Sequence, residues 1–142
     1  MKLLIGTLVV LLAACATSQT VPAQTSRYQD LDQKSCEILT RGNTVYVSGN
    51  LRQAIETFKN IEDIDRVGHG ACTASVYATM GTSWALLANA ALSNNPQTAA
   101  LNYKRAAFYN RAFAYALACK SGDCDPAAKF WAPDSIAFWG SQ

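Results

Sequence analysis

The sequence has few charged side chains and a single histidine, His69. Among its 142 residues, 15% are Asp, Glu, Lys or Arg, and the formal net charge is +2. The five cysteines form no C-x-x-C pair, whereas structural zinc sites draw on such pairs and on several histidines. The composition therefore argues against a bound metal, and the weak, scattered positive charge argues against binding to nucleic acid.

Motifs that mark common enzymes are also missing. The chain has no phosphate-binding P-loop, no G-x-S-x-G nucleophile elbow and no G-x-G-x-x-G dinucleotide fingerprint. His69 lies three residues before Cys72, but in an exported protein we expect this cysteine to form a disulfide rather than act as a nucleophile. We predict a protein that is not an enzyme, with no catalytic residue and no cofactor.

The N-terminus has the pattern of an export signal. Lys2 is followed by an apolar run at 3–12, which is about ten residues long and too short for a membrane-spanning helix of about twenty. The next residues, LAAC at 12–15, resemble the lipobox of bacterial lipoproteins. The resemblance implies that residues 1–14 are a signal peptide and that Cys15 is the lipidated first residue of the mature protein. An ordinary secretory signal followed by a chance cysteine is the alternative.

The lipobox resemblance also predicts where the protein resides. Several acyl chains on one cysteine hold a protein stably at a membrane, since each buried methylene contributes about 0.8 kcal/mol. In the lipoprotein family an Asp directly after the cysteine favours the inner membrane, and Ala16 at this position implies the outer membrane. Residues 15–27 are rich in Ser, Thr, Gln and Ala and have few large apolar groups. We expect them to form a flexible tether to a single domain at 28–142.

Four cysteines remain once Cys15 is assigned to the lipid. An even number in an oxidising compartment indicates two disulfides, with three possible connectivities. We favour Cys36–Cys72, which would contribute about 3–4 kcal/mol by the chain-entropy model, together with Cys119–Cys124. Four buried free thiols are the alternative.

The domain at 28–142 has the pattern of an all-α fold with about four or five helices. Apolar residues at helical spacing predict a first helix from Tyr28 to Arg41, and Gly42-Asn43 would end it. The β-branched residues at 44–47 fit either a short extended piece or a strained helical turn.

Further helices are indicated by their N-caps and by their apolar spacing. Asn50 caps a helix with Gln53 in a variant of the capping box, and the apolar stripe continues to Ile61 or Glu62. After a loop at 68–70, the uncharged stretch at 71–92 contains many Ala, Ser and Thr residues. This composition favours a helix packed inside a small domain over a membrane span.

Two further helix starts place a cap residue directly before proline. Asn95-Pro96 predicts a helix that continues to about Cys119, and Asp125-Pro126 predicts a short one that includes Trp131. We expect the aromatic residues near the C-terminus to cover the helical core.

Charged residues cluster in one place and are sparse in another. Glu62, Asp63 and Asp65 lie at a predicted helix end and lack the spacing of an EF-hand calcium loop, so we interpret them as a solvated terminus. No further acidic residue occurs until Asp123, and the bases between them are Arg66, Lys104, Arg105, Arg111 and Lys120. This distribution indicates a low-charge, largely buried helical segment.

The segment from Trp84 to Ala107 resembles one helix pair of the tetratricopeptide and Sel1-like repeat families. In these families small residues let two helices approach and an aromatic residue fills the groove. The matching positions are Trp84, Leu87, Ala99, Tyr103 and Ala106, and Gly49, Ala54 and Phe58 repeat part of the spacing. The resemblance implies antiparallel helix pairs and a surface that holds a peptide or a partner helix.

A second resemblance, to helical lipoproteins associated with TRAP transporters, is looser. It depends on Asn95-Pro96, Tyr103, Tyr109, Ala118, Trp131 and Trp139. Small lipoproteins of this build also resemble pilotins and other accessory factors that help envelope complexes assemble.

We therefore expect a protein-binding scaffold or accessory factor for a secretion, pilus or transport complex. Lys104 and Arg111 are seven residues apart on one helix face, and they are candidate partner contacts or simple solvated charges. A stand-alone surface inhibitor is one alternative. The other is a small-molecule-binding protein with an aromatic pocket at Trp84, Tyr103, Tyr109 and Trp131.

Overall fold

The protein is built from helices throughout residues 23–65 and 67–120, the part that the computed structural model describes. No strand occurs in these two ranges, so the all-α prediction is confirmed. In chain order the helices are α1 (Ala23–Val47), α2 (Leu51–Phe58), α3 (Ile61–Asp65), α4 (Thr73–Ala91) and α5 (Pro96–Lys120).

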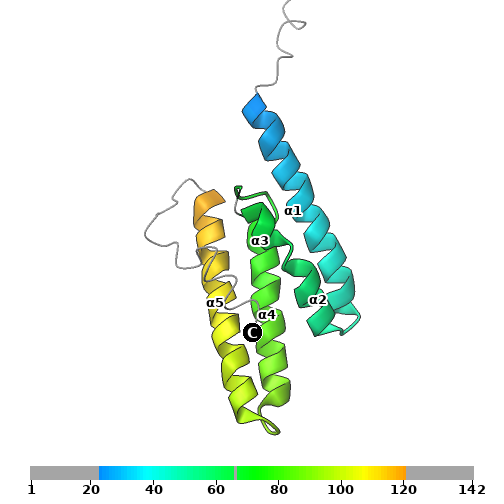
Figure 1. The fold of residues 1–142 in the computed structure, drawn as a ribbon, viewed down its shortest axis with the longest axis vertical. Helices are drawn as coiled ribbons and strands as arrows, with labels where there is room; N and C mark the ends of the chain where they lie inside the picture. Colours follow the sequence, from blue (N-terminus) through cyan, green and yellow to red (C-terminus); the bar gives the residue numbers. More distant parts are fainter. Residues whose placement is uncertain (1–22, 66, 121–142) are drawn as a thin grey trace, which may run out of the picture.

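The helices form two antiparallel pairs. A short turn joins α4 to α5, and the two helices pack along their length (Figure 1). On the other side, α1 and α2 fold back on each other, and α2 also packs on α4. The N-terminal part of α1 projects beyond the ends of the other helices (Figure 1). It begins at Ala23, inside the stretch expected to be a tether.

The hydrophobic core surrounds α4, which packs against α5 on one side and against α1, α2 and α3 on the other. Apolar positions three and four apart on each helix supply it, because these positions share one helix face. Its largest fully buried side chains include Phe58, Ile61, Tyr77, Met80 and Tyr109. Gly81 brings α4 close to α5, since a Cβ there would overlap Asn110 and lie 3.4 Å from the carbonyl oxygen of Ala106.

Both described N-caps that the sequence predicted are confirmed. The side-chain oxygen of Asn50 accepts the backbone N–H of Gln53 at 3.2 Å, and its amide donates to the Gln53 side chain at 3.0 Å. Asn95 accepts the N–H of Thr98 at 3.1 Å, with Pro96 as the first residue of α5. Each cap satisfies N–H groups that have no partner within the first helical turn.

The predicted end of the first helix at Gly42-Asn43 is wrong. The helix continues through both residues and through 44–47, because Gly42 is a packing position: a Cβ there would overlap the ring of Phe58 in α2. The missing side chain lets the two helices approach closely, which offsets the low helix propensity of glycine. The chain reverses instead after Val47, where Gly49 adopts a positive φ of 88°.

The second predicted helix is interrupted rather than continuous. It ends at Phe58, and a separate turn, α3, begins at Ile61. The side chain of Asn60 donates to the carbonyl oxygen of Thr57 at 2.9 Å, a local bond that competes with the helical backbone pattern. Phe58 and Ile61 are both fully buried, so the break does not interrupt the core.

The uncharged stretch at 71–92 forms α4, as predicted, and packs against α5, α2 and α1. No helix among the described residues combines the length and the apolar character needed to cross a membrane. The predicted signal peptide and the predicted helix at Asp125-Pro126 lie outside the described residues.

Candidate functional site

A disulfide joins α1 to the start of α4. Cys36 and Cys72 are bonded, with their Cα atoms 4.9 Å apart, as the sequence predicted. Cys119 is disulfide-bonded as well. Cys124, its predicted partner, lies outside the described residues, so this pairing stays a prediction. Because Cys72 is oxidised, it carries no thiol that His69 could activate.

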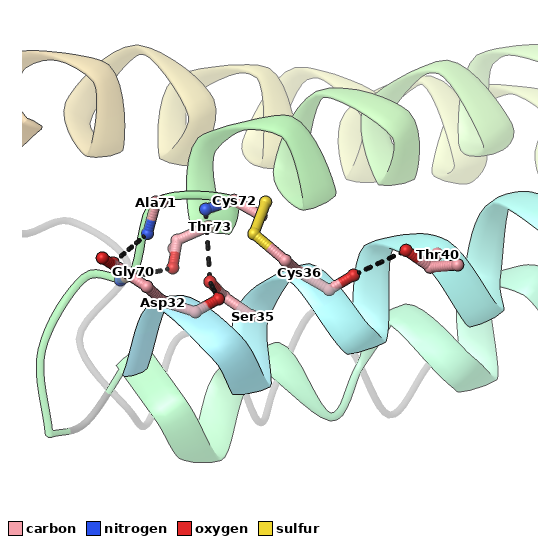
Figure 2. The surroundings of a disulfide bond; sticks show 8 residues. All are labelled: Asp32, Ser35, Cys36, Thr40, Gly70, Ala71, Cys72 and Thr73. Carbon is pink, nitrogen blue, oxygen red and sulfur yellow. Dashed lines mark hydrogen bonds between the residues drawn. A yellow bond between two sulfur atoms is a disulfide. The ribbon is translucent and has the colours of Figure 1, made fainter. Parts of the chain in front are cut away.

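Hydrogen bonds surround the Cys36–Cys72 bond and fix the loop before α4 against α1 (Figure 2). The N–H of Ala71 donates to the carboxylate of Asp32 at 2.7 Å, and the N–H of Cys72 donates to the hydroxyl of Ser35 at 3.2 Å. A Cβ on Gly70 would overlap the backbone of α1. We call the assembly of Asp32, Ser35, Cys36 and residues 70–72 the disulfide clasp. It holds the loop before α4 to α1 through one covalent bond and two hydrogen bonds.

An open groove of about 550 Å³ borders the disulfide clasp on α1. Its described lining consists of Gln33, Cys36, Glu37, Thr40 and Arg41, which repeat at helical spacing along one face. Glu37 accepts a hydrogen bond from Gln33 at 3.1 Å, and Thr40 donates to the carbonyl oxygen of Cys36 at 2.9 Å. We call this surface the α1 groove. Its described side chains are polar or charged apart from the disulfide-bonded Cys36, with one acidic and one basic group among them.

The interpretation of the acidic residues at the end of α3 as a solvated terminus is wrong for Asp65, whereas Asp63 is exposed. The side chain of Asp65 is 5% exposed and accepts the hydroxyl of Tyr77 at 2.6 Å. His69 Nδ1 lies 2.7 Å from the other carboxylate oxygen, and neither of these two atoms has another polar partner. The ring of His69 also packs edge-on against Tyr115. The helix end was misinterpreted because Tyr77 and His69 reach it from later segments of the chain.

A second buried tyrosine points at the same acidic end. Tyr109 donates to Glu62 at 3.1 Å, and its ring stacks on Tyr77 with a centroid distance of 6.2 Å. Burial, and then the neighbouring carboxylate of Asp65, raise the pKa of Tyr77 well above its usual value. Burial and the carboxylate of Glu62 raise the pKa of Tyr109 in the same way. We call Glu62, Asp65, His69, Tyr77 and Tyr109 the acidic cluster.

A buried arginine is the feature that the sequence interpretation missed. Arg105 is 4% exposed, its Nη1 donates to the side chain of Asn102 at 2.8 Å, and its guanidinium lies over the ring of Trp84 at 4.5 Å. One signal was available: positions 102, 105, 109 and 112 form a helical stripe that faces the core. We call Trp84, Asn102 and Arg105 the basic cluster.

Three of the four aromatic residues predicted to form a ligand pocket are described, and they do not share one site. Trp84 and Tyr109 belong to the hydrophobic core, whereas Tyr103 is 39% exposed and bonds to Asn89 across the α4–α5 surface. Trp131 lies outside the described residues. Of the repeat-like positions on α5, Ala99 and Ala106 are buried and Tyr103 lies at the surface.

Lys104 and Arg111, the predicted partner contacts, are both exposed on α5. Their seven-residue spacing places them on one side of the helix. Within 23–65 and 67–120, no group of three or more His, Cys, Asp or Glu side chains is arranged to hold a metal ion.

Comparison with known proteins adds no further assignment. No family model matches the chain, and neither a curated protein nor a solved structure is significantly similar to it.

Proposed function

We propose that the protein is an outer-membrane-anchored lipoprotein whose helical domain binds another protein of the cell envelope. The observation that carries this proposal is the α1 groove beside the disulfide clasp. In this proposal the lipid on Cys15 localises the domain and the groove supplies the contact. The partner belongs to a secretion, pilus or transport complex, so the protein acts as an accessory factor and not as an enzyme.

The shape of the α1 groove favours a protein segment as its occupant. Its volume of about 550 Å³ is within the range of binding sites, but it is open along a helix and does not enclose a ligand. An amphipathic partner helix or an extended peptide fits such a surface by placing apolar side chains in it. Glu37 and Arg41 lie one turn apart there, so they can orient a partner of mixed charge.

The disulfide clasp supports the same proposal through rigidity. It covalently fixes the helix that carries the α1 groove to the start of α4. A site whose backbone is already fixed loses less conformational entropy when it binds. We also propose that the domain binds its partner as tetratricopeptide-like helix pairs do. The location in the outer membrane and a role similar to that of pilotins belong to the same proposal.

A site-specific crosslink tests the α1 groove. A photoreactive amino acid at Thr40 should give a discrete crosslinked product in intact envelopes, because this residue lines the groove. Thr82 is a matched control: it is also an exposed helical threonine whose hydroxyl bonds the carbonyl four residues earlier, but on α4. Equal crosslinking at both positions, or none at Thr40, would contradict the proposed groove.

A second experiment tests the anchor separately. Cys15→Ser should abolish labelling with a palmitate analogue and move the protein from the membrane fraction to the soluble one. Ala16→Asp should keep the label and move the protein from the outer to the inner membrane. Unchanged labelling of the Cys15→Ser chain would refute lipidation and leave the groove experiment valid.

The exposed basic residues on α5 are a second surface that can contact the same partner. Lys104→Glu together with Arg111→Glu should weaken the crosslink at Thr40 if the partner spans both surfaces. An unaffected crosslink would restrict the contact to α1.

A further inference from the structure

Three hydrogen-bond donors in the basic cluster are buried and have no partner. They are Nε and Nη2 of Arg105 and the indole Nε1 of Trp84. The guanidinium lies against the Trp84 ring at 4.5 Å, so the donors are carried by two side chains in direct contact. A buried polar atom without a partner costs about 1–3 kcal/mol, and more when it is charged.

The guanidinium stays charged in this environment. Burial, and to a lesser degree the charge of Arg52, lower the pKa of Arg105, but an arginine side chain keeps its proton in proteins. None of the carboxylates that the structure describes is paired with Arg105. The site therefore holds an excess positive charge between α4 and α5.

The two unpartnered atoms of Arg105 lie on one edge of its planar group. Nε–H and one N–H of Nη2 point in parallel, which is the fork that matches the two oxygens of a carboxylate. Nη1, on the other edge, is already used by Asn102 at 2.8 Å. Asn102 and the face of Trp84 therefore fix the guanidinium and leave its bidentate edge buried and without a partner.

We propose that the basic cluster is a binding site for the carboxylate of a small organic acid. The fork of Arg105 binds the two carboxylate oxygens, and the indole N–H of Trp84 supplies a third donor to the same group. This site is separate from the α1 groove, so it goes beyond the protein-binding function proposed above. An aspartate from residues 121–142 is the competing source of the same chemistry.

Nuclear magnetic resonance of the full chain in detergent micelles tests the site directly. Acetate, succinate and benzoate are the probes, added at constant ionic strength against chloride. Binding should shift the signals of Arg105 Nε–H and Trp84 Nε1–H together and raise Tm by several degrees near saturation. Unchanged signals with all three carboxylates would overturn the proposal.

Three variants separate recognition from general charge. Arg105→Lys keeps a positive charge and loses the fork, so it should weaken binding at least tenfold. Trp84→Phe keeps the ring and loses the N–H, so it should weaken binding less. Arg111→Lys is the matched control, an exposed arginine on the same helix, and it should leave binding unchanged. Equal affinities for Arg105→Lys and wild type would contradict the role of the fork.

A triple variant distinguishes the two sources of the carboxylate. Asp123→Asn, Asp125→Asn and Asp134→Asn together should leave the Arg105 Nε–H signal of the probe-free protein unchanged if the site takes a free acid. A shift of that signal in the triple variant, without any added probe, would assign the site to the chain's own aspartate and overturn the proposal.

Discussion

The acidic and basic clusters are both buried around α4 and α5, yet they differ in how completely their polar atoms are paired. In the acidic cluster, Asp65 Oδ2 accepts the hydroxyl of Tyr77, and Oδ1 lies 2.7 Å from His69 Nδ1 at ion-pair distance, although these last two atoms form no regular hydrogen bond. In the basic cluster, two of the three nitrogens of Arg105 have none. A buried charged atom with a polar neighbour at contact distance is partly compensated, whereas one without such a neighbour lowers stability until something binds. The first is therefore structural and the second is suited to a ligand.

The largest expected effect comes from removing the central acceptor of the acidic cluster. Asp65→Ala leaves the Tyr77 hydroxyl and the His69 ring nitrogen without a partner in a buried position. We expect the free energy of unfolding, measured with urea, to fall by about 3 kcal/mol. Asp63→Ala is the control, because this residue is exposed on the same short helix, and it should change stability by less than about 0.5 kcal/mol. Similar losses for both variants would show that Asp65 is not held as described.

Removing the charged group of the basic cluster should change the free energy of unfolding in the opposite direction. Arg105→Met removes a buried charge that has only one hydrogen bond and keeps much of the apolar contact with Trp84. In the absence of carboxylate we expect stability to be unchanged or to rise by about 1–2 kcal/mol. A loss of more than about 2 kcal/mol in urea unfolding would mean that the guanidinium is paired in the free protein.

Stability should also fall in alkaline solution because of the two buried tyrosines. Their pKa values are raised in the folded protein, while an unfolded tyrosine ionises near pH 10. Below about pH 10 both tyrosines are protonated in the folded and the unfolded chain, so their contribution to the free energy of unfolding is fully present. Above about pH 10 the unfolded chain releases these protons while the folded chain retains them. Each tyrosine should then lower the free energy of unfolding by about 1.4 kcal/mol per pH unit.

Urea unfolding between about pH 8 and 11 measures this slope. The upper limit lies about one unit above the pKa of an unfolded tyrosine, which is roughly 10. Tyr77→Phe and Tyr109→Phe should each remove about half of it, and the double variant should remove nearly all of it. An unaltered slope in the double variant would assign the alkaline loss to other groups.

The smallest expected effect is the loss of a single bond in the acidic cluster at neutral pH. Tyr109→Phe keeps the stacked ring and removes the 3.1 Å hydrogen bond to Glu62. Since Glu62 is only partly buried, water can replace this bond, and we expect a loss of about 1 kcal/mol in urea unfolding. A loss as large as that of Asp65→Ala would mean that the two ends of the cluster act as one unit.

The sequence predicted features that depend on neighbouring residues. The caps at Asn50 and Asn95 were found because a cap needs only the next three residues. The Cys36–Cys72 pair was found because few cysteines were left to combine. The fold class followed from apolar spacing in the same way.

Features that depend on distant residues were missed. The sequence predicts a helix end at Gly42, because the steric need for glycine comes from the ring of Phe58 on the next helix, which the local sequence does not reveal. The sequence predicts a solvated Asp65 because Tyr77 and His69 reach this residue only after the chain has folded back. Arg105 was counted among scattered bases, although its helical register places it on the buried face of α5.

The disulfide clasp determines how a mechanical load would cross the domain. A pull on the N-terminal end of α1 travels along the helix to Cys36 and then passes through a covalent bond to Cys72, one residue before α4 begins. The segment between these cysteines, which contains the end of α1 and all of α2 and α3, is bypassed and carries no tension. The disulfide clasp thus shields the contact between α1 and α2 from a force applied at the N-terminus, so such a force does not separate these two helices.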